Sequence, residues 1–169
     1  ISKGDYVSKE VKETLSPSMD IQLASNFERL IYYINNSDSE KTAEIMKKVK
    51  ENSYQIEKNN LDIIQKDFLS ESCNEQETLD IIKKNYEENN VILDPHTAVG
   101  VGVAKKLSFN DCLVLSTAHP CKFPDATNKA INKHEKLPKE LQHVLEKKEN
   151  FQVLKNTTEE VKNFIKSKI

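Results

Sequence analysis

The sequence VILDPHTAVGVG, residues Val91–Gly102, decides the fold. Its first three residues, Val91–Leu93, form a short apolar run of the kind found in buried strands. Asp94 is a favourable helix N-cap and Pro95 suits the first helical position, so a helix should begin there and end near Leu107. A strand that leads directly into a helix is typical of α/β proteins.

A second buried strand is expected at Cys112–Leu115, a continuous apolar run that suits a strand covered on both faces. A loop, Ser116–Phe123, follows this run and leads into a helix that starts at Pro124. Helical patterns dominate, and the strands are too few to complete a sheet. The sequence therefore predicts a helix-rich α/β fold in which part of the sheet belongs to missing sequence.

Helical periodicity and capping residues predict further elements. Apolar residues recur at helical spacing over Asp20–Ile34. Pairs that can cap a helix should open three more helices: Ser37 with Glu40, Asn74 with Glu77, and Thr157 with Glu160. A short strand is expected at Phe151–Leu154, whereas residues 53–72 fit either a strand or a helix.

The composition is that of a globular protein with a charged surface, since 37% of the residues are hydrophobic and 31% are charged. A formal net charge of −2 gives no reason to expect nucleic acid or an anionic membrane as a partner. No apolar run approaches the roughly 20 residues that a membrane-spanning helix needs. The cysteines lack metal-ligand spacing and are expected to be free thiols in a reducing cytoplasm: Cys73, Cys112 and Cys121.

Arginine occurs only once in the chain. Of the 25 residues that are lysine or arginine, only Arg29 is an arginine. In a sequence that otherwise uses lysine, this guanidinium favours a site that needs a bidentate fork on a carboxylate or a phosphate. An ordinary ion pair is the alternative.

Ligands of open α/β sheets bind beyond the carboxyl ends of the strands, which here means Asp94–Gly102 and Ser116–Phe123. Each of these segments holds one histidine, His96 or His119. Metal ligation needs at least three converging donors, and no third donor has a suitable spacing, so no metal site is predicted.

Gly100 and Gly102 fall inside the helix that follows Asp94. A glycine in a helix interior costs about 1 kcal/mol relative to alanine, so a close approach to the backbone is expected there. Packing against a neighbouring helix or strand is the favoured explanation, and a bound planar cofactor is the alternative.

Three long blocks of the sequence carry a resemblance to a known family. They are TLSPSMDIQLASNFERL (Thr14–Leu30), ILDPHTAVGV (Ile92–Val101) and LSTAHPCKFPDA (Leu115–Ala126). In this order they resemble blocks of the threonine synthases, in the bacterial and fungal branch of that family. The resemblance covers nearly the whole chain, so residues 1–169 are expected to form one C-terminal segment of the catalytic region.

The family consists of pyridoxal-phosphate enzymes of fold type II. The resemblance therefore implies pyridoxal 5'-phosphate as the cofactor and the conversion of O-phosphohomoserine and water into L-threonine and phosphate by γ-elimination and β-addition. In the family, the lysine that carries the cofactor and a glycine-rich loop for its phosphate precede these blocks. Neither matches anything here, so the implied partner is the missing N-terminal part of the same enzyme, and the fragment alone should be inactive.

The resemblance also implies roles for individual residues, carried over by position. Thr117 matches the residue whose hydroxyl meets the pyridine nitrogen of the cofactor. The catalytic candidates in the active-site wall are Asp94, His96 and Thr97. The implied substrate-binding residues are Ser25, Asn26 and Arg29 near the substrate phosphate, together with His119 and Lys122.

Two alternatives to a threonine synthase remain open on the sequence alone. One is another fold type II enzyme, such as a dehydratase, which would leave Arg29 and Asn26 without a substrate phosphate to bind. The other is a truncated, non-catalytic paralog that binds a ligand or a partner protein.

Overall fold

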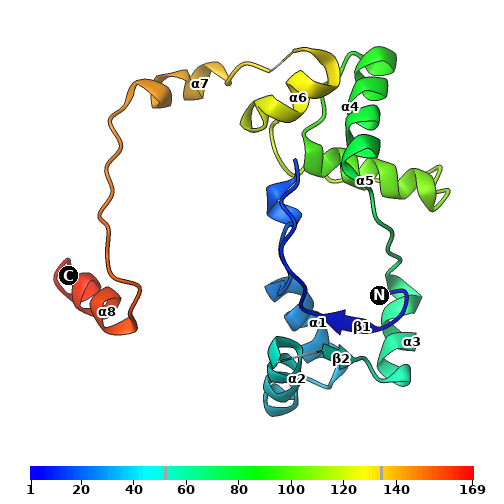
Figure 1. Ribbon diagram of the computed structural model, residues 1–169, viewed down its shortest axis with the longest axis vertical. Coiled ribbons are helices and arrows are strands. Elements are labelled where there is room, and N and C mark those ends of the chain that lie inside the picture. The colour runs from blue at the N-terminus through cyan, green and yellow to red at the C-terminus, as the bar shows by residue number, and fades with distance from the viewer. Residues whose placement is uncertain (52, 134) are drawn as a thin grey trace. The chain divides into compact units, whose positions relative to one another are not determined.

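Helices make up most of the structure, a computed structural model that describes residues 1–51, 53–133 and 135–169 (Figure 1). The chain divides into two units, Ile1–Lys136 and Leu137–Ile169. The elements of the first unit are β1 (Asp5–Val7), η1 (Pro17–Met19), α1 (Ser25–Ile34), α2 (Ser39–Glu51), β2 (Ser53–Gln55), α3 (Lys58–Asp67), α4 (Glu75–Asn89), α5 (Pro95–Lys106), η2 (Pro120–Lys122) and α6 (Pro124–Ile131).

One apolar core joins α1 and α2 to a small sheet (Figure 1). The strands β1 and β2 pair antiparallel, with Tyr6 opposite Tyr54. The aromatic ring of Tyr6 meets the ring of Phe27 edge to face, with the centroids 5.0 Å apart. The buried side chains of this core are those of Ile31, Ile45, Met46 and Val49.

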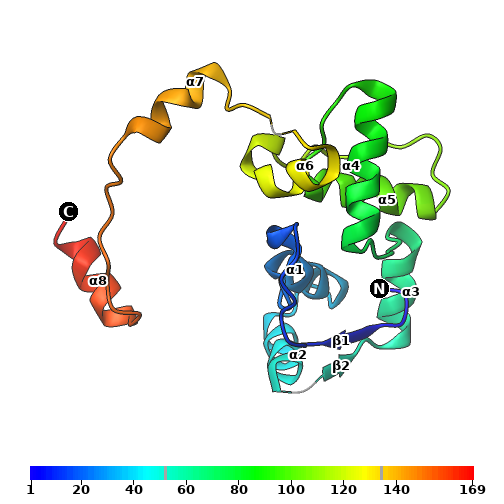
Figure 2. The same cartoon turned by 45° about the horizontal axis from the view of Figure 1, so that its top comes forward.

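A second packing arrangement centres on α4, which contacts both α5 and α6 (Figure 2). Gly102 lets α5 approach α4 closely, because a Cβ at this position would lie 2.5 Å from Cδ1 of Ile81 and 3.0 Å from Sγ of Cys73. The predicted packing role of Gly102 is therefore confirmed. Each of the three helices contributes a side chain that is almost completely buried: Ile82, Ala98 and Ala126.

Polar contacts join the first turn of α4 to the last turn of α5. Lys106, in the last turn of α5, lies 2.7 Å from the Glu77 carboxylate and also donates a hydrogen bond to the carbonyl of Ser72. The hydrogen bond from Lys106 lowers the pKa of the Glu77 carboxyl below its ordinary value. Glu77 also completes the predicted capping box with Asn74, so the start of α4 is confirmed.

The second unit contains short helices: α7 (Lys139–Gln142), η3 (His143–Glu146) and α8 (Thr158–Lys166). Thr157 accepts a hydrogen bond from the N–H of Glu160, which confirms the predicted start of the last helix. Many apolar side chains of this unit are exposed, among them Leu145, Phe151 and Val153. No helix in the described ranges of the chain has both the length and the apolarity that a bilayer crossing requires.

The helix-rich character is as predicted, but the positions of the strands are not. Val91–Leu93, Cys112–Leu115 and Phe151–Leu154 form no strand in the structure. The side chains of Leu113 and Leu115 are 98% and 79% exposed, although the sequence pattern predicted burial on both faces. A strand needs a neighbour to pair with, and within the described residues no backbone group of 112–116 is hydrogen-bonded to another backbone group.

Two helix starts also differ from the predictions. The helix expected from Asp20 begins at Ser25, because the Asp20 carboxylate instead accepts hydrogen bonds from the N–H and the hydroxyl of Thr14. The capping box expected at Ser37 does not form. Asp38 accepts a hydrogen bond from the N–H of Lys41 and opens α2 in its place.

We expect Ile82→Ala to destabilise the 169-residue chain by about 2–5 kcal/mol, because it leaves a cavity in the contact of α4 with its neighbours. The neighbouring exposed residue provides the control, since Lys83→Ala should change the free energy of unfolding by less than about 0.5 kcal/mol. Urea unfolding followed by circular dichroism measures both changes. Equal shifts for the two variants would contradict the packing described for α4.

Candidate functional site

The start of α5 is organised by one buried carboxylate. Asp94 is the N-cap of this helix and Pro95 its first residue, as predicted. The Oδ1 atom of Asp94 accepts hydrogen bonds from the N–H of His96 at 3.0 Å and from the N–H of Thr97 at 3.4 Å. Only 1% of Asp94 is exposed, so the protein itself must supply the donors that water would otherwise provide.

His96 connects this carboxylate to the turn η1. Its Nε2 atom accepts a hydrogen bond from the backbone N–H of Ser18 at 3.1 Å. A backbone N–H can only donate, so the ring proton is on Nδ1, which lies 3.0 Å from Oδ1 of Asp94 and donates to it. The ring also stacks obliquely on Phe123, with centroids 4.7 Å apart. Both nitrogens of His96 are therefore engaged in holding neighbouring segments together.

Thr97 connects the same carboxylate to the loop that follows residue 115. Its hydroxyl donates a short hydrogen bond to Oδ2 of Asp94. The Oγ1 atom of Thr97 itself accepts a hydrogen bond from the backbone N–H of Thr117 at 3.2 Å. The structure thus brings together Asp94, His96, Thr97 and Thr117, which belong to the two segments that the sequence singled out for ligand binding, although neither segment follows a strand.

A groove of about 870 Å³ lies beside this network. His96, Gly100 and Thr117 line it together with apolar residues of α5 and of the 109–115 segment. Met19 and residues 65–69 at the end of α3, which include Lys66 and Asp67, also line it. The Thr117 side chain is exposed, and its hydroxyl makes no hydrogen bond to any residue that the structure describes. At Gly100 a Cβ would lie 3.1 Å from Cγ1 of Val114, so the glycine keeps the wall of the groove close to the helix backbone.

His119 and Lys122 lie on the exposed turn η2, after the Thr117 loop. The Nδ1 atom of His119 accepts a hydrogen bond from the N–H of Cys121 at 3.2 Å, which caps the turn. The ammonium of Lys122 lies 5.9 Å from the centroid of the Phe123 ring. Within the described parts of the chain, no three His, Cys, Asp or Glu side chains are grouped so that they could hold a metal ion.

Arg29 lies in a different hollow, of about 430 Å³, between α1 and α2. Its guanidinium is exposed and forms no ion pair with any described residue. Ser25 shares this hollow, whereas Asn26 does not line it and its side chain instead accepts the N–H of Phe27. The remaining lining residues are Glu28, Tyr32, Ser39, Thr42 and Ala43. No residue lines both this hollow and the groove beside Thr117.

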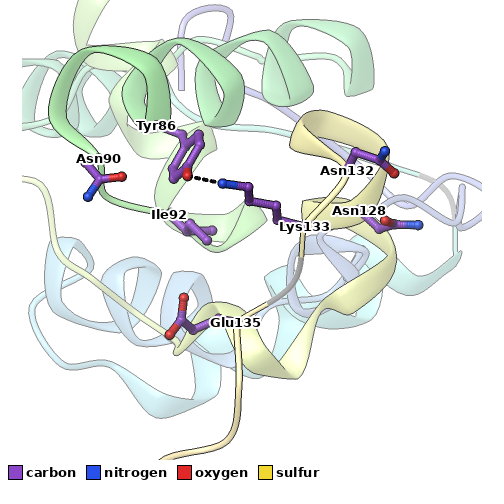
Figure 3. Close-up of a pocket in the computed structure, with 7 residues that line it drawn as sticks. All are labelled: Tyr86, Asn90, Ile92, Asn128, Asn132, Lys133 and Glu135. Atoms are coloured by element: carbon purple, nitrogen blue, oxygen red, sulfur yellow. Dashed lines mark hydrogen bonds between the residues drawn. The ribbon is translucent and has the colours of Figure 1, made fainter.

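The sequence analysis did not single out a third hollow, of about 570 Å³, which lies between the ends of α4 and α6 (Figure 3). Lys133 donates a hydrogen bond of 2.5 Å to the hydroxyl of Tyr86 across it. Asn90 and Asn132 also line it, but both are left-handed C-caps of their helices, a position that favours asparagine for structural reasons. None of the candidate site residues lines this hollow.

Comparison with known proteins identifies similar chains. A family model described as "Threonine synthase, C-terminal" matches residues 97–165. Threonine synthase of Saccharomyces cerevisiae is 39% identical over 96% of this chain and 37% of its own length, and that of Pseudomonas aeruginosa is 33% identical over 98% and 36%. The crystal structure of a PLP-bound threonine synthase from Brucella melitensis matches with a TM-score of 0.81 and 34% identity, over 98% of this chain and 36% of that one. The chain thus spans a little over a third of the length of these relatives.

We expect Asp94→Asn to lower the free energy of unfolding by about 2–3 kcal/mol, because the amide loses one acceptor and turns an NH₂ group toward buried donors. Asp38→Asn is a matched control at an exposed helix start, where asparagine caps as well as aspartate does, so a change within about 0.5 kcal/mol is expected. Urea unfolding of the two variants measures the difference. If both variants lose equally little stability, the Asp94 carboxylate is not the centre of the network.

Proposed function

Because the chain belongs to the threonine synthase family, of which it matches the C-terminal part, we propose that it is the C-terminal portion of a threonine synthase. The complete enzyme would convert O-phosphohomoserine and water into L-threonine and phosphate, with pyridoxal 5'-phosphate as cofactor. The observation that carries this proposal is the match of 98% of the chain, at a TM-score of 0.81, to a PLP-bound threonine synthase. We assign residues 1–169 as a whole to the catalytic region.

The groove beside Thr117 fits one edge of a planar cofactor. It offers a hydroxyl that no described residue uses, and a glycine wall at Gly100 that lets a flat ring lie close to the α5 backbone. We propose that the Thr117 hydroxyl contacts the pyridine nitrogen. When bound, the cofactor supplies an electron sink for the amino-acid substrate. A neutral hydroxyl, unlike a carboxylate, does not stabilise a positive charge on that nitrogen. Thr117 would therefore leave the cofactor ring less electron-withdrawing than a carboxylate would.

The proposed site for the substrate phosphate is the hollow that contains Arg29. A guanidinium without an ion-pair partner among the described residues is available for a bidentate contact with a phosphate. The hydroxyl groups of Ser25 and Ser39 line the same hollow and can donate further hydrogen bonds. We keep Asn26, His119 and Lys122, none of which lines either hollow, as substrate-binding candidates, and Asp94, His96 and Thr97 as parts of the active-site wall.

The missing part of the enzyme is the proposed partner of this chain. The exposed side chains of Leu113 and Leu115, together with the unpaired backbone of 112–116, support a sheet that another segment completes. The three thiols are free, in keeping with a reducing cytoplasm. The relatives compared above, from Saccharomyces cerevisiae and Pseudomonas aeruginosa, carry the name threonine synthase, so a dehydratase or a non-catalytic paralog is not favoured.

We expect the 169-residue chain alone to retain no pyridoxal phosphate, because no lysine in it matches the family's attachment site. The chain is incubated with excess cofactor and dialysed, and the absorbance of bound cofactor near the visible edge is then measured. The complete enzyme, treated in the same way, is the positive control and should also release phosphate from O-phosphohomoserine. A stoichiometric band that survives dialysis of the 169-residue chain would contradict the proposed division of the site.

We expect Arg29→Lys in the complete enzyme to lower kcat/KM for O-phosphohomoserine about ten- to a hundred-fold, because a charged hydrogen bond contributes about 1.5–3 kcal/mol. Inhibition by inorganic phosphate should weaken in parallel. Because Arg29→Lys keeps the positive charge, the matched control is the reverse exchange, Lys47→Arg, at an exposed position of α2, and its kinetics should stay normal. A loss of thermal stability in Arg29→Lys with unchanged kinetics would make Arg29 a structural residue.

A further inference from the structure

The hydroxyl of Thr97 has two partners that fix both of its roles. It accepts the backbone N–H of Thr117 at 3.2 Å, and a backbone N–H can only donate. Its own proton is then free for the Asp94 carboxylate, to which it donates. Thr97 is almost completely buried, so water does not compete for these two bonds.

The carboxylate at the other end of this chain of bonds is itself held in place. Asp94 caps α5 and accepts the N–H and the Nδ1–H of His96, whose Nε2 atom is in turn bonded to Ser18. Rotating the carboxylate would leave several buried donors without a partner, which is costly in free energy. The Thr97 oxygen is therefore a fixed point at the start of a regular helix.

The segment that this fixed point holds has few other polar contacts. Among the described residues, the bond from the Thr117 N–H to Thr97 is the one hydrogen bond that joins residues 110–118 to α5. An apolar approach also joins this segment to α5, since a Cβ at Gly100 would lie 3.1 Å from Cγ1 of Val114. The hydrogen bond fixes the position of the Thr117 backbone along the axis of α5. It therefore also fixes where the Thr117 hydroxyl lies in the groove.

We propose that Thr97 is a positioning residue for the cofactor: the Asp94 carboxylate orients its hydroxyl, which holds the Thr117 backbone so that the Thr117 side chain meets the pyridine nitrogen. This inference rests on the proposed function for the contact between Thr117 and the cofactor. A catalytic group that is misplaced by about 1 Å loses much of its effect, so a single backbone hydrogen bond can control it. His96 contributes to this link only by holding the Asp94 carboxylate, since its Nε2 atom serves the η1 turn through Ser18.

The test compares Thr97→Val, which removes the hydroxyl, with Thr97→Ser, which keeps it. Both are made in the complete enzyme, with Thr117→Val as the reference for loss of the cofactor contact. Hydrogen exchange of the Thr117 amide in cofactor-free enzyme reports the hydrogen bond directly, and the absorption band of bound pyridoxal phosphate reports its consequence. We expect Thr97→Val to lower amide protection and kcat each about tenfold, with KM nearly unchanged, and to shift the band as Thr117→Val does. Thr97→Ser should resemble the unmodified enzyme in amide protection, in kcat and in the absorption band.

A double variant separates positioning from general destabilisation. If Thr97 acts through Thr117, then Thr97→Val combined with Thr117→Val should lose no more kcat than Thr117→Val alone. Thr78→Val is the matched control, since Thr78 is also a buried helical threonine but its hydroxyl donates to the Asn74 carbonyl. It should leave the band and the Thr117 exchange unchanged. Thr97→Ala replaces Thr97→Val if the valine variant does not fold.

Three results would overturn the inference: normal exchange of the Thr117 amide in Thr97→Val, equal damage by Thr97→Ser and Thr97→Val, or additive losses in the double variant. If Thr117→Val itself left kcat and the absorption band unchanged, the conclusion would be different. It would overturn the proposed contact of Thr117 with the cofactor, while the exchange rate would still decide whether Thr97 holds Thr117.

Discussion

A carboxylate that is shielded from water has to be surrounded by donors, and much of this structure is arranged to supply them to Asp94. The donors are two backbone N–H groups of α5, the His96 ring and the Thr97 hydroxyl. The positive end of the helix dipole adds to their effect. Because His96 and Thr97 each hold a further backbone N–H, the η1 turn and the Thr117 loop take their positions from the same carboxylate.

Local rules predicted the parts of the fold that depend on neighbouring residues. Asp94 and Pro95 open α5, and Asn74 opens α4, because capping needs residues only a few positions apart. The prediction at Ser37 was wrong because an equally good cap, Asp38, lies one residue later. The predicted strand at Cys112–Leu115 was also wrong, since a strand depends on a partner segment and not on its own sequence alone.

The sequence singled out Asp94, His96, Thr97 and Thr117 as candidates, and their roles stay predictions; the structure adds the hydrogen bonds that connect them. The bonds of Asp94 to His96 and Thr97 are local, but the bonds from Thr97 to Thr117 and from His96 to Ser18 span 20 and 78 residues and follow no local pattern. Arg29, which the composition singled out, lies in a hollow without an ion-pair partner among the described residues, and its contact with a phosphate stays a prediction. That Asn26 lies outside this hollow could not have been foreseen, since it is decided by the rotation of α1 about its axis.

The extended segment that carries Leu113 and Leu115 has a practical consequence for handling the chain on its own. Unpaired N–H and C=O groups beside alternating apolar side chains are a template onto which another extended strand can add. Copies of the chain can pair through this segment, and each added strand leaves its other edge free to pair with a further copy. The tendency of the isolated chain to aggregate in concentrated solution, and its yield when it is expressed alone, therefore depend on whether this edge is covered.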